Sequence, residues 1–513
     1  MTAAVDRSWV ADHDWRLLIG GKLRPAASGR TFECVSPIDQ QVICLLPDAG
    51  GDDVEDAVGA ASEAAAGWAA LPPRERAGLV RALAGVLRTH REELAALDAI
   101  DVGNAYTAML GDVEHGAVGI ELMADMAFQL RGETLPATAT HLHYTTREPY
   151  GVVARITAFN HPIMFAAQKI AAPLVAGNAV ILKPSEHASL SALRMGELFA
   201  GHLPEGLLSV LVGDGAGMPE ALVRHRGVAR IGFIGSEPTG RAIQRAAASA
   251  GVKTVTLELG GKNAMIICPD VDIADAAATA VKGMNFIGWQ SQSCSSTSRV
   301  LVHVSIAEEL VEQIARQAAR IRIGDPLSPE TQMGTLANQE QYRKSLHHID
   351  QAVREGAHLV CGGERPAGPD YARGLYLPPT VLDRVEPGME IARQEVFGPV
   401  LSIMRWTEED DAVAVANDVP YGLTGAVCTN DIARGLRLAQ RLDVGYVWVN
   451  DGATHFAGVP FGGRKASGIG SEESVEELIS YTQLKSVNVR VADTTHPTGP
   501  NPNTAQPGGA GNE

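Results

Sequence analysis

The sequence predicts an α/β protein in which helices pack on parallel β-sheets. Two observations lead to this prediction: short apolar segments alternate with helix-compatible segments from about residue 152 onward, and a second series of the same kind follows Cys294. Strands that alternate with helices form right-handed βαβ units around a sheet that is buried on both faces. A chain of 513 residues is also too long for one core, and its length suggests roughly three domain-sized units.

The first 150 residues are expected to be mostly helical. Short strands and turns come first, up to about residue 50. A long helical region then extends from about Asp52 to Leu130, with apolar residues at helical spacing, and the proline pair at 72 and 73 breaks it once. Two extended segments, 141–146 and 152–156, flank a Pro/Gly turn and predict a β-hairpin.

The two βα series and the end of the chain supply the remaining elements. The first series is expected to contribute strands at 180–182, 208–212, 228–233 and 255–259. The second is expected to contribute strands at 300–302, 357–360, 400–404 and 444–450, with helices at 307–321 and 340–355. A strand-like segment follows at 480–489. Residues 494–513, rich in Pro, Gly, Thr and Asn, are expected to be a disordered tail because they have nothing to bury.

Composition and charge exclude several classes of function. The formal net charge is −17 and the pI is near 5.4, whereas nucleic acids and anionic membranes bind basic surfaces. No apolar run approaches the roughly 18 residues that span a bilayer, and no secretion signal is expected because the first residues lack an apolar core. The six cysteines are thinly spread and form no Cys-x-x-Cys pair, which favours reduced thiols in the cytoplasm and no metal site.

A cysteine among small hydroxyl residues is the first candidate for chemistry. Cys294 lies in the segment Gln-Ser-Gln-Ser-Cys-Ser-Ser, between a helix-compatible run at 274–286 and an apolar strand at 299–302. Such a junction can expose the sulfur to a cleft, although an isolated cysteine is more often a buried small hydrophobe. Only a small fraction of an ordinary thiol ionises at neutral pH, so a nucleophilic cysteine needs a base from elsewhere in the chain.

Two further residues could supply the base and an oxyanion donor. Glu258 ends an apolar strand at the sheet edge where open α/β sheets bind ligands, and apolar neighbours raise the pKa of an acid toward that of a general base. Asn160 lies in a turn before His161-Pro162, where its amide could donate to a developing oxyanion. Taken alone, a solvated strand-end glutamate and a turn Asn that bonds its own backbone explain these residues equally well.

Two strand ends carry residues that suit a dinucleotide. Lys183 and Glu186 follow the strand at 180–182, and an acid at this place favours a free ribose 2′-hydroxyl over a 2′-phosphate. Ser236 opens a helix after the strand at 228–233, and a helix N-terminus can bind pyrophosphate. The Gly-x-Gly-x-x-Gly fingerprint is absent from these segments, so each by itself could be an ordinary strand-to-helix turn.

Together, and in this order, these segments resemble the aldehyde dehydrogenase superfamily, and the resemblance covers about residues 17–490. The motifs that carry it are Phe159-Asn160-His161-Pro162, Leu182-Lys183-Pro184-Ser185-Glu186, Phe233-Ile234-Gly235-Ser236, Leu257-Glu258-Leu259-Gly260-Gly261-Lys262, Gln292-Ser293-Cys294, Glu395-Val396-Phe397-Gly398-Pro399 and Pro460-Phe461-Gly462-Gly463. Chance agreement of so many motifs in family order is implausible.

The resemblance implies a role for each candidate residue. Cys294 would be the nucleophile, Glu258 the general base, and Asn160, together with the backbone N–H of Cys294, the oxyanion hole. The residues implied to bind the cofactor, NAD rather than NADP, are Ile156, Lys183, Ser185, Glu186, Gly235, Ser236, Leu259, Glu395 and Phe397. The residues implied to line the aldehyde tunnel, for each of which ordinary packing is an equal explanation, are Phe165, Gln168, Trp289, His455 and Phe456.

The same resemblance implies a domain plan and a reaction. Two Rossmann-like parallel-sheet domains and a small β element for oligomerisation are implied: a NAD-binding domain at 1–130 and 152–258, a catalytic domain at 259–462, and the oligomerisation element at 131–151 and 478–493. The implied reaction oxidises a small-molecule aldehyde to the carboxylic acid through a cysteine thiohemiacetal and thioester, in a homodimer or homotetramer. The sequence does not indicate which aldehyde.

Two alternatives stay open, and the chain departs from the family pattern at two positions. A CoA-acylating semialdehyde dehydrogenase has the same fold, but this branch typically lacks the glutamate found here at Glu258. A non-catalytic binding protein with this fold would have no need of the intact set of Cys294, Glu258 and Asn160. The departures are Ser291, where the family usually has glycine, and His161, where an aromatic residue is common.

Overall fold

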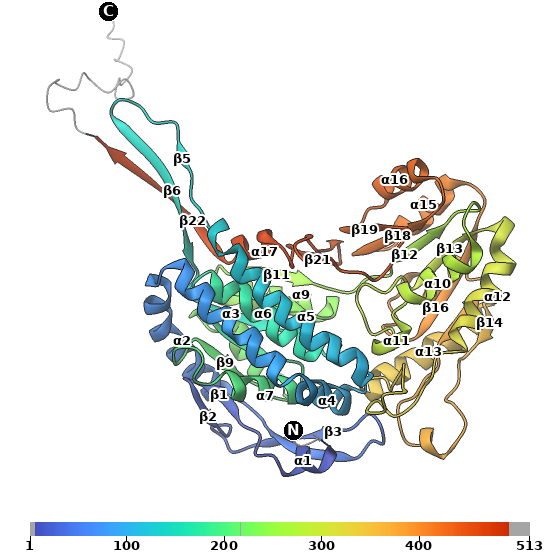
Figure 1. Ribbon diagram of the computed structural model, residues 1–513, viewed down its shortest axis with the longest axis horizontal. Coiled ribbons are helices and arrows are strands. Elements are labelled where there is room, and N and C mark those ends of the chain that lie inside the picture. Colours follow the sequence, from blue (N-terminus) through green and yellow to red (C-terminus); the bar gives the residue numbers. More distant parts are fainter. Residues whose placement is uncertain (1–5, 216, 492–513) are drawn as a thin grey trace, which may run out of the picture.

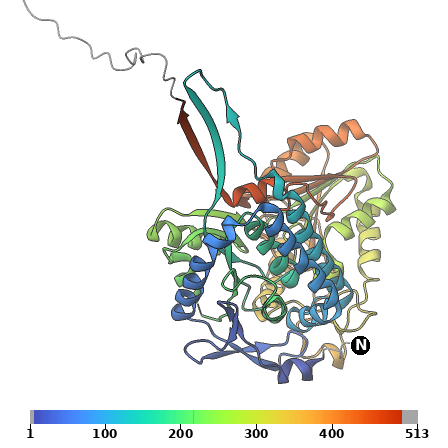
Figure 2. The same ribbon diagram turned by 60° about the vertical axis from the view of Figure 1, so that its left-hand side comes forward.

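The computed structural model describes residues 6–215 and 217–491 of the chain. Within them, two bodies built on separate β-sheets lie side by side, and a narrow β arm projects from the first (Figures 1 and 2). The predicted α/β fold is confirmed, because parallel strands form the centre of both sheets. None of the described helices is both long enough and apolar enough to cross a membrane. The predicted disordered tail at 494–513 lies outside the described residues.

The first sheet has the strand order β2-β1-β9-β8-β7-β10-β11-β21. Its strands are β1 (Leu17–Ile19), β2 (Lys22–Arg24), β7 (Val152–Ile156), β8 (Ala179–Lys183), β9 (Leu208–Val210), β10 (Val228–Ile234), β11 (Thr254–Glu258) and β21 (Gly468–Ile469). The strands from β9 to β11 are parallel, and short antiparallel strands close both edges. Both β7 and β8 are buried along their whole length, which explains their continuous apolar sequence.

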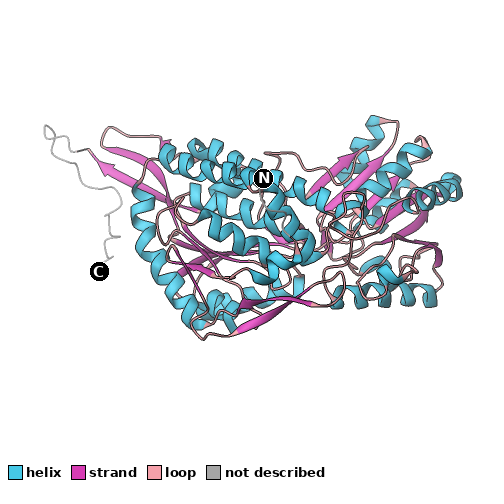
Figure 3. Cartoon of the chain, turned by 60° about the horizontal axis from the view of Figure 1, so that its bottom comes forward, coloured by secondary structure: helices cyan, strands magenta, loops and turns pink. Residues whose placement is uncertain are grey.

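Helices pack on the strands of both bodies (Figure 3). Those of the first body are α1 (Arg7–Asp12), α2 (Gly51–Ala70), α3 (Pro73–Thr89), α4 (Arg91–Val102), α5 (Tyr106–Asp125), η1 (Met126–Gln129), α6 (Pro162–Val175), α7 (Leu190–Phe199), α8 (Gly217–Arg224) and α9 (Glu237–Ala250); β3 (Thr31–Val35) and β4 (Val42–Pro47) form a separate ribbon. The prediction of one break in the helical region is wrong. The region is also interrupted at His90, and at Gly103, whose φ of 76° ends α4 in a conformation that glycine adopts without strain.

The second sheet has the order β14-β15-β16-β13-β12-β18-β19. Its strands are β12 (Ala264–Ile267), β13 (Arg299–His303), β14 (His358–Cys361), β15 (Thr380–Asp383), β16 (Val400–Trp406), β18 (Thr424–Cys428) and β19 (Tyr446–Val449). The accompanying elements are α10 (Ile273–Gly283), α11 (Phe286–Trp289), η2 (Val304–Ile306), α12 (Ala307–Ala318), α13 (Gln339–Glu355), η3 (Pro369–Tyr371), α14 (Glu390–Arg393), α15 (Glu409–Asn417), α16 (Ile432–Arg441), and the ribbon of β17 (Tyr421–Gly422) and β20 (Arg464–Lys465). The sequence analysis missed β12, β15 and β18.

The chain crosses between the two sheets next to the predicted active site. β11 ends at Glu258 in the first sheet, and β12 begins at Ala264 in the second, so only residues 259–263 connect them. Later, β21 returns to the first sheet and pairs antiparallel with β11, where Gly468 is the partner of Glu258. Because no helix separates β11 from β12, the alternating pattern that marks the other strands is absent here.

The arm consists of β22 (Thr482–Arg490), β6 (His141–Pro149) and β5 (Thr134–Leu135), and α17 (Val475–Ser480) leads into β22. The predicted hairpin between 141–146 and 152–156 is therefore wrong: β6 pairs with β22 and β5, whereas β7 joins the first sheet. The Asn178 side chain explains the change of direction, because its Oδ1 accepts from the backbone N–H groups of Tyr150 (2.7 Å) and Gly151 (3.1 Å). These bonds direct the chain into another sheet instead of folding it back.

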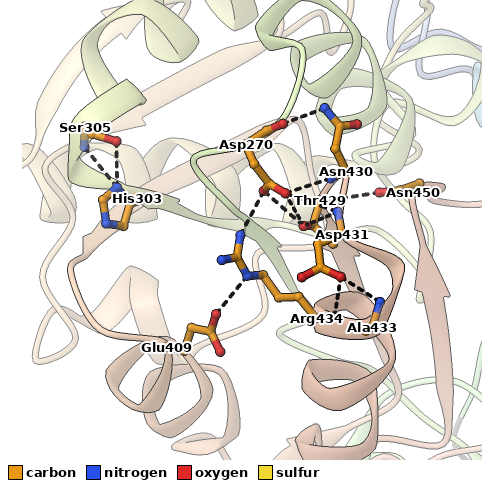
Figure 4. A network of polar contacts seen from close by, with 10 residues as sticks. All are labelled: Asp270, His303, Ser305, Glu409, Thr429, Asn430, Asp431, Ala433, Arg434 and Asn450. Atoms are coloured by element: carbon orange, nitrogen blue, oxygen red, sulfur yellow. Dashed lines mark hydrogen bonds and ion pairs between the residues drawn. The ribbon is translucent and has the colours of Figure 1, made fainter.

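A polar network ties together the strand ends of the second sheet (Figure 4). Asp270, which follows β12, accepts from the Thr429 hydroxyl (2.9 Å) and from the backbone N–H groups of Asn430 and Asp431 (both 3.1 Å). Arg434 on α16 pairs with Asp270 (3.2 Å). Since the Asp270 carboxylate is surrounded by donors of this chain, the network serves to hold the loop between β18 and α16.

Candidate active site

The carboxyl ends of four neighbouring strands place several predicted residues in one row. In the register of the first sheet, Lys183 on β8 is the partner of Ile156 on β7, and Ile156 is the partner of Phe233 on β10. One step further, Ile234 on β10 is the partner of Glu258 on β11. Open α/β sheets bind their ligands outside this edge, so the row is the candidate cofactor and catalytic edge.

At one end of the row, Lys183 and Glu186 form a close ion pair. The Nζ of Lys183 lies 2.8 Å from the Glu186 carboxylate, and the two side chains have exposed fractions of 7% and 34%. Burial opposes ionisation of Glu186, but the Lys183 cation lowers its pKa below the ordinary value. The hydroxyl of Ser185 accepts from the His187 N–H (3.2 Å) and shapes the turn. A carboxylate beside an ammonium group can bind vicinal hydroxyls such as those of a ribose.

In the middle of the row, Gly235 and Ser236 begin α9. Ser236 is the N-cap of this helix, and its Oγ accepts from the Thr239 N–H (3.4 Å). The Gly235 N–H donates to the Glu258 carbonyl (3.1 Å), and a Cβ at Gly235 would collide with the ring of Phe233. Pro238 has no N–H and the Thr239 N–H is bonded to Ser236, so the N–H groups of Ser236 and Glu237 are those that remain at this terminus to bind a phosphate.

Glu395 reaches the same edge from the second body. Its Oε1 accepts from the Gly261 N–H (2.9 Å), in the segment that crosses between the sheets. A Cβ at Gly260 would collide with the Glu395 carboxylate, which explains why small residues occupy this crossing. Burial raises the pKa of Glu395, while the charge of Lys344 on α13 opposes this rise. Lys344 is therefore a further candidate residue that the sequence analysis missed.

Two other predicted cofactor residues also lie at the junction of the two bodies. Phe397 packs edge-on against Phe159, with ring centroids 5.7 Å apart. Leu259 is buried, and its N–H donates to the Ser467 carbonyl (2.9 Å), just before β21. Every predicted cofactor residue thus lies along the row of strand ends or at this crossing.

The loop that carries Cys294 has an unusual backbone. After α11, Gln290 and Ser291 have φ values of 52° and 57°, in the left-handed region that favours glycine. The buried Gln290 side chain holds the loop, because its Nε2 donates to the carbonyls of Gly103 (3.2 Å) and Thr335 (2.8 Å) and to the Asn104 side chain (3.1 Å). Ser291 therefore occupies a glycine-type position, and Gln290 compensates with contacts across the junction.

Asn263 fixes the same loop from the crossing segment. Its Nδ2 donates to the carbonyls of Cys294 (2.7 Å) and Ser296 (2.9 Å), and its Oδ1 accepts from the Thr424 N–H (3.1 Å). The buried Gln292 side chain accepts from the Ala337 N–H (3.1 Å). No local signal in the sequence identified Asn263, because its partners lie on two separate segments, the Cys294 loop and the start of β18.

The structure brings Cys294 and Glu258 together. The half-buried Cys294 thiol and the Glu258 carboxyl group, whose residue is 6% exposed, lie close enough for each to shift the pKa of the other. Burial and the charge of Glu472 raise the pKa of Glu258 to about 8. Burial and the charge of Glu258 raise the pKa of Cys294 well above the ordinary value. An acid that titrates near neutrality, beside a thiol, can exchange protons with it.

Asn160 connects to the Cys294 loop through its backbone. Its carbonyl accepts from the Asn104 side chain (2.9 Å), and Asn104 also accepts from Gln290 (3.1 Å). Asn160 itself is 3% exposed, at the start of α6. A single chain of hydrogen bonds thus fixes the candidate oxyanion donor relative to the nucleophile loop.

The predicted tunnel residues fall into two groups. Phe165 and Trp289 flank the same ring, His161, with centroid distances of 5.3 and 5.2 Å. His455 packs against Phe461 (4.6 Å), and its Nδ1 donates to the Glu473 carboxylate (3.1 Å).

The two remaining tunnel candidates, Gln168 and Phe456, do not belong to either of these groups of rings. Gln168 directs its amide to the His115 carbonyl (3.0 Å). Phe456 is half exposed, at 51% of its surface.

A buried ion pair beside the site also escaped the sequence analysis. Lys169 on α6 lies 2.8 Å from the Glu472 carboxylate, and Arg155 on β7 lies 2.9 Å from it. Burial opposes ionisation of Glu472, but the charges of Lys169 and Arg155 lower its pKa to about 2. Because the Glu472 carboxylate also raises the pKa of Glu258, this ion pair sets part of the electrostatic environment of the candidate base.

Comparisons with known proteins agree with this geometry. A sequence profile described as the aldehyde dehydrogenase family matches residues 24–487. The chain is 42% identical over 491 residues to the aldehyde dehydrogenase tropH of Talaromyces stipitatus. The matched residues make up 94% of this chain and 94% of that protein. The structure of a betaine aldehyde dehydrogenase from Staphylococcus aureus in complex with NAD⁺ is 32% identical, with a TM-score of 0.91, over 96% of this chain and 99% of that one. A 3,6-anhydro-L-galactose dehydrogenase in complex with NAP (NADP) is 32% identical, with a TM-score of 0.89, over 93% and 100%.

Proposed function

The chain belongs to the aldehyde dehydrogenase family, and from this premise we propose that it oxidises an aldehyde to the carboxylic acid through a thioester on Cys294, with NAD as the electron acceptor. The observation that carries the proposal is the proximity of the Cys294 thiol to the Glu258 carboxyl group, through which each shifts the pKa of the other. A nucleophile beside a base of pKa about 8 suits acyl chemistry near neutral pH.

The first half of the reaction forms the acyl-enzyme. Glu258 accepts the Cys294 proton, and the thiolate attacks the aldehyde carbon to give a thiohemiacetal. The Asn160 amide and the backbone N–H of Cys294 hold the oxyanion. When bound, NAD would accept the hydride from the thiohemiacetal carbon. The loss of this hydride from the carbon would leave the thioester. Hydrogen bonds from Gln290 and Asn263 keep the thiol aligned with its base.

The second half of the reaction hydrolyses the thioester. Glu258 first releases to solvent the proton that it took from Cys294. It then removes a proton from a water molecule, which attacks the thioester carbon, and it gives this proton to the departing Cys294 thiolate as the carboxylic acid leaves. A base is required because the acyl acceptor is water. The Glu472 carboxylate lies near Glu258, and its negative charge raises the pKa of Glu258, whereas the Lys169 cation that pairs with Glu472 opposes this rise.

NAD fits the residues on the row of strand ends. The orphan N–H groups at the start of α9 suit a pyrophosphate, and the Lys183–Glu186 pair suits a ribose. The negative charge of Glu186 supports NAD over NADP, because it repels a 2′-phosphate. From the second body, Glu395 and Phe397 would place the nicotinamide ribose, with Ile156, Ser185 and Leu259 lining the path.

The domain plan and the assembly state belong to the same proposal. Residues 1–130 and 152–258 would form the NAD-binding domain, residues 259–462 the catalytic domain, and 131–151 with 478–493 the oligomerisation element. Exposed apolar residues on the arm, Leu142, Leu484 and Val489, support a homodimer or homotetramer. Six free cysteines support a reducing compartment such as the cytoplasm.

NADH absorbance with a panel of aliphatic, aromatic and amino aldehydes tests the proposal. Cys294→Ala is expected to abolish NADH formation, whereas Glu258→Gln is expected to give a burst of NADH without turnover. Full steady-state activity of Cys294→Ala would contradict the assignment. Stimulation by free CoA with an acyl-CoA product would instead show the CoA-acylating alternative, and no turnover of any aldehyde would favour a binding protein.

A further inference from the structure

A buried carboxylate lies beside Asn160 and the nucleophile loop, and the proposed mechanism does not use it. Asp112 on α5 is 1% exposed. Its Oδ2 accepts from Nδ1 of His161 (2.9 Å) and from Nε1 of Trp289 (3.2 Å). His161 begins α6, directly after Asn160, and Trp289 ends α11, so three elements converge on one carboxylate.

Aromatic rings surround the imidazole that Asp112 holds. The His161 ring lies 5.3 Å from the Phe165 ring and 5.2 Å from the Trp289 ring. Aromatic side chains with this spacing offer flat apolar surfaces on which another ring can pack. The cluster therefore combines surfaces for an aromatic group with a fixed polar group.

Two acceptor positions in this cluster have no partner within the described residues. The Oδ1 atom of Asp112 is buried there without a hydrogen bond. The Nε2 atom of His161 likewise makes none to the described residues, and imidazole nitrogen can donate or accept according to its protonation. A buried acceptor without a donor is unfavourable, so a ligand that brings an O–H group would be favoured at this place.

The charges around Cys294 decide which polar ligand fits. The carboxylates of Glu258, Glu395 and Glu473 all contribute to the raised pKa of the Cys294 thiol. Of these, Glu473 is ionised, because the hydrogen bond from His455 lowers its pKa against the effect of burial, and it would repel an aldehyde that carries a carboxylate. A quaternary ammonium group has no hydrogen to donate to Asp112 or His161. A neutral hydroxyl can both donate and accept, and it satisfies either protonation state of the imidazole.

We propose, on the basis of the proposed function, that Asp112 and His161 form a hydroxyl-recognition site and that the preferred substrates are hydroxylated aromatic aldehydes. The ring of the substrate packs against Phe165 and Trp289, and its hydroxyl binds Nε2 of His161. Asp112 also acts as a positioning residue, because it fixes the His161 ring through Nδ1.

Steady-state kinetics with matched aldehydes tests this inference. We compare 3- and 4-hydroxybenzaldehyde with the corresponding methoxybenzaldehydes, which keep the oxygen but lose the donor, and with benzaldehyde and betaine aldehyde. For at least one hydroxybenzaldehyde, kcat/KM is expected to be higher by about tenfold or more than for the corresponding methoxybenzaldehyde. Both His161→Phe and Asp112→Asn are expected to lower this ratio by about tenfold, and the double variant is expected to lose less than the product of the two effects.

His225→Phe is the matched control, because His225 pairs with Glu55 (2.9 Å) on the surface of the first body. Its hydroxyl-to-methoxy ratio is expected to equal that of the unaltered protein. An unchanged ratio in both His161→Phe and Asp112→Asn would overturn the inference, as would a preference for betaine aldehyde over every hydroxylated aldehyde.

Binding to the Cys294→Ala variant separates this site from the proposed reaction. Calorimetry with the same hydroxy and methoxy aldehydes needs no turnover, and preferential binding of the hydroxylated compounds that His161→Phe abolishes would support the site. Equal binding of the two series would overturn it. If the unaltered protein oxidised no aldehyde while the binding preference held, the proposed function would fail and the hydroxyl-recognition site would stand.

Discussion

Glu258 and Cys294 lie close enough for each to shift the pKa of the other, although they belong to different bodies of the molecule. Glu258 ends β11 of the first sheet, and Cys294 precedes β13 of the second. Burial raises the pKa of both groups, and the charge of Glu258 raises the pKa of Cys294 further, whereas Cys294 lowers the pKa of Glu258. The pair therefore rests as thiol and acid at low pH and becomes reactive as the pH rises.

The pH dependence of hydrolysis follows from this pair. Because the pKa of Glu258 is about 8, the ionised base accumulates as pH increases, and thioester hydrolysis should rise with pH and level off above about 8. Steady-state kcat measured by NADH absorbance across this range checks the prediction. Glu258→Gln should remove the rise, and a kcat that is independent of pH in the unaltered protein would contradict it.

Replacement of Ser291 by glycine should stabilise the protein. Ser291 has a φ of 57°, and its buried hydroxyl has no partner within the described residues. Ser291→Gly should therefore raise the free energy of unfolding by about 1 kcal/mol, measured by chemical denaturation.

Gln290 offers the control for this prediction, because its φ of 52° is similar but its side chain makes four hydrogen bonds that glycine would lose. Gln290→Gly should lower the free energy of unfolding by about 2 kcal/mol. Equal effects of the two substitutions would show that backbone strain does not govern this loop.

The preference for NAD should depend on the charge of Glu186. Glu186→Gln keeps the size of the side chain and removes the anion beside Lys183. The ratio of kcat/KM for NAD to that for NADP should fall by about tenfold, because a 2′-phosphate no longer meets a carboxylate. Glu220→Gln, at an exposed helical pair with Arg224, is the control and should leave the ratio unchanged. A lower KM for NADP than for NAD in the unaltered protein would refute the preference.

The buried pair of Lys169 and Glu472 should be important for stability. Lys169→Met removes one of the two cations beside a buried carboxylate and should lower the free energy of unfolding by about 3 kcal/mol. Lys282→Met, at a pair with Asp451 that is largely exposed, should lower it by less than about 1 kcal/mol. Denaturation curves of the two variants provide the comparison, and similar midpoints would contradict the prediction.

The same ion pair predicts that the protein becomes less stable as the pH falls. The pKa of Glu472 falls from its ordinary value of 4.5 to about 2 on folding. Its contribution to stability is therefore complete above the ordinary value and is lost as the pH falls toward about 2. Lys169→Met should weaken this dependence, because the pKa of Glu472 then rises toward its ordinary value.

Each incorrect prediction about the fold has a physical cause. The segments 141–146 and 152–156 look like a hairpin because an extended pattern does not encode which strand will be its partner. Asn178, which lies far along the chain, decides this through its bonds to Tyr150 and Gly151. Likewise, β12 was missed because it follows β11 without a helix between them.

Residues that act through distant contacts were also missed. No sequence motif marks Asn263, Lys344 or Glu472. The role of each depends on its interactions with residues on other elements. Asp112 looks in sequence like any helical acid, and only the packing of α5, α6 and α11 places it against His161 and Trp289.

The sequence by itself determined the α/β class and the residues at the ends of the parallel strands. Alternation of strands and helices sets those ends, and the residues predicted to act there, such as Lys183, Ser236 and Glu258, follow directly from them. Only the tertiary structure decided that Glu258 meets Cys294 and that Glu395 meets Gly261. The physical reason is that local patterns encode backbone conformation and the buried face, whereas contacts between two sheets depend on how both cores pack around residues 259–263.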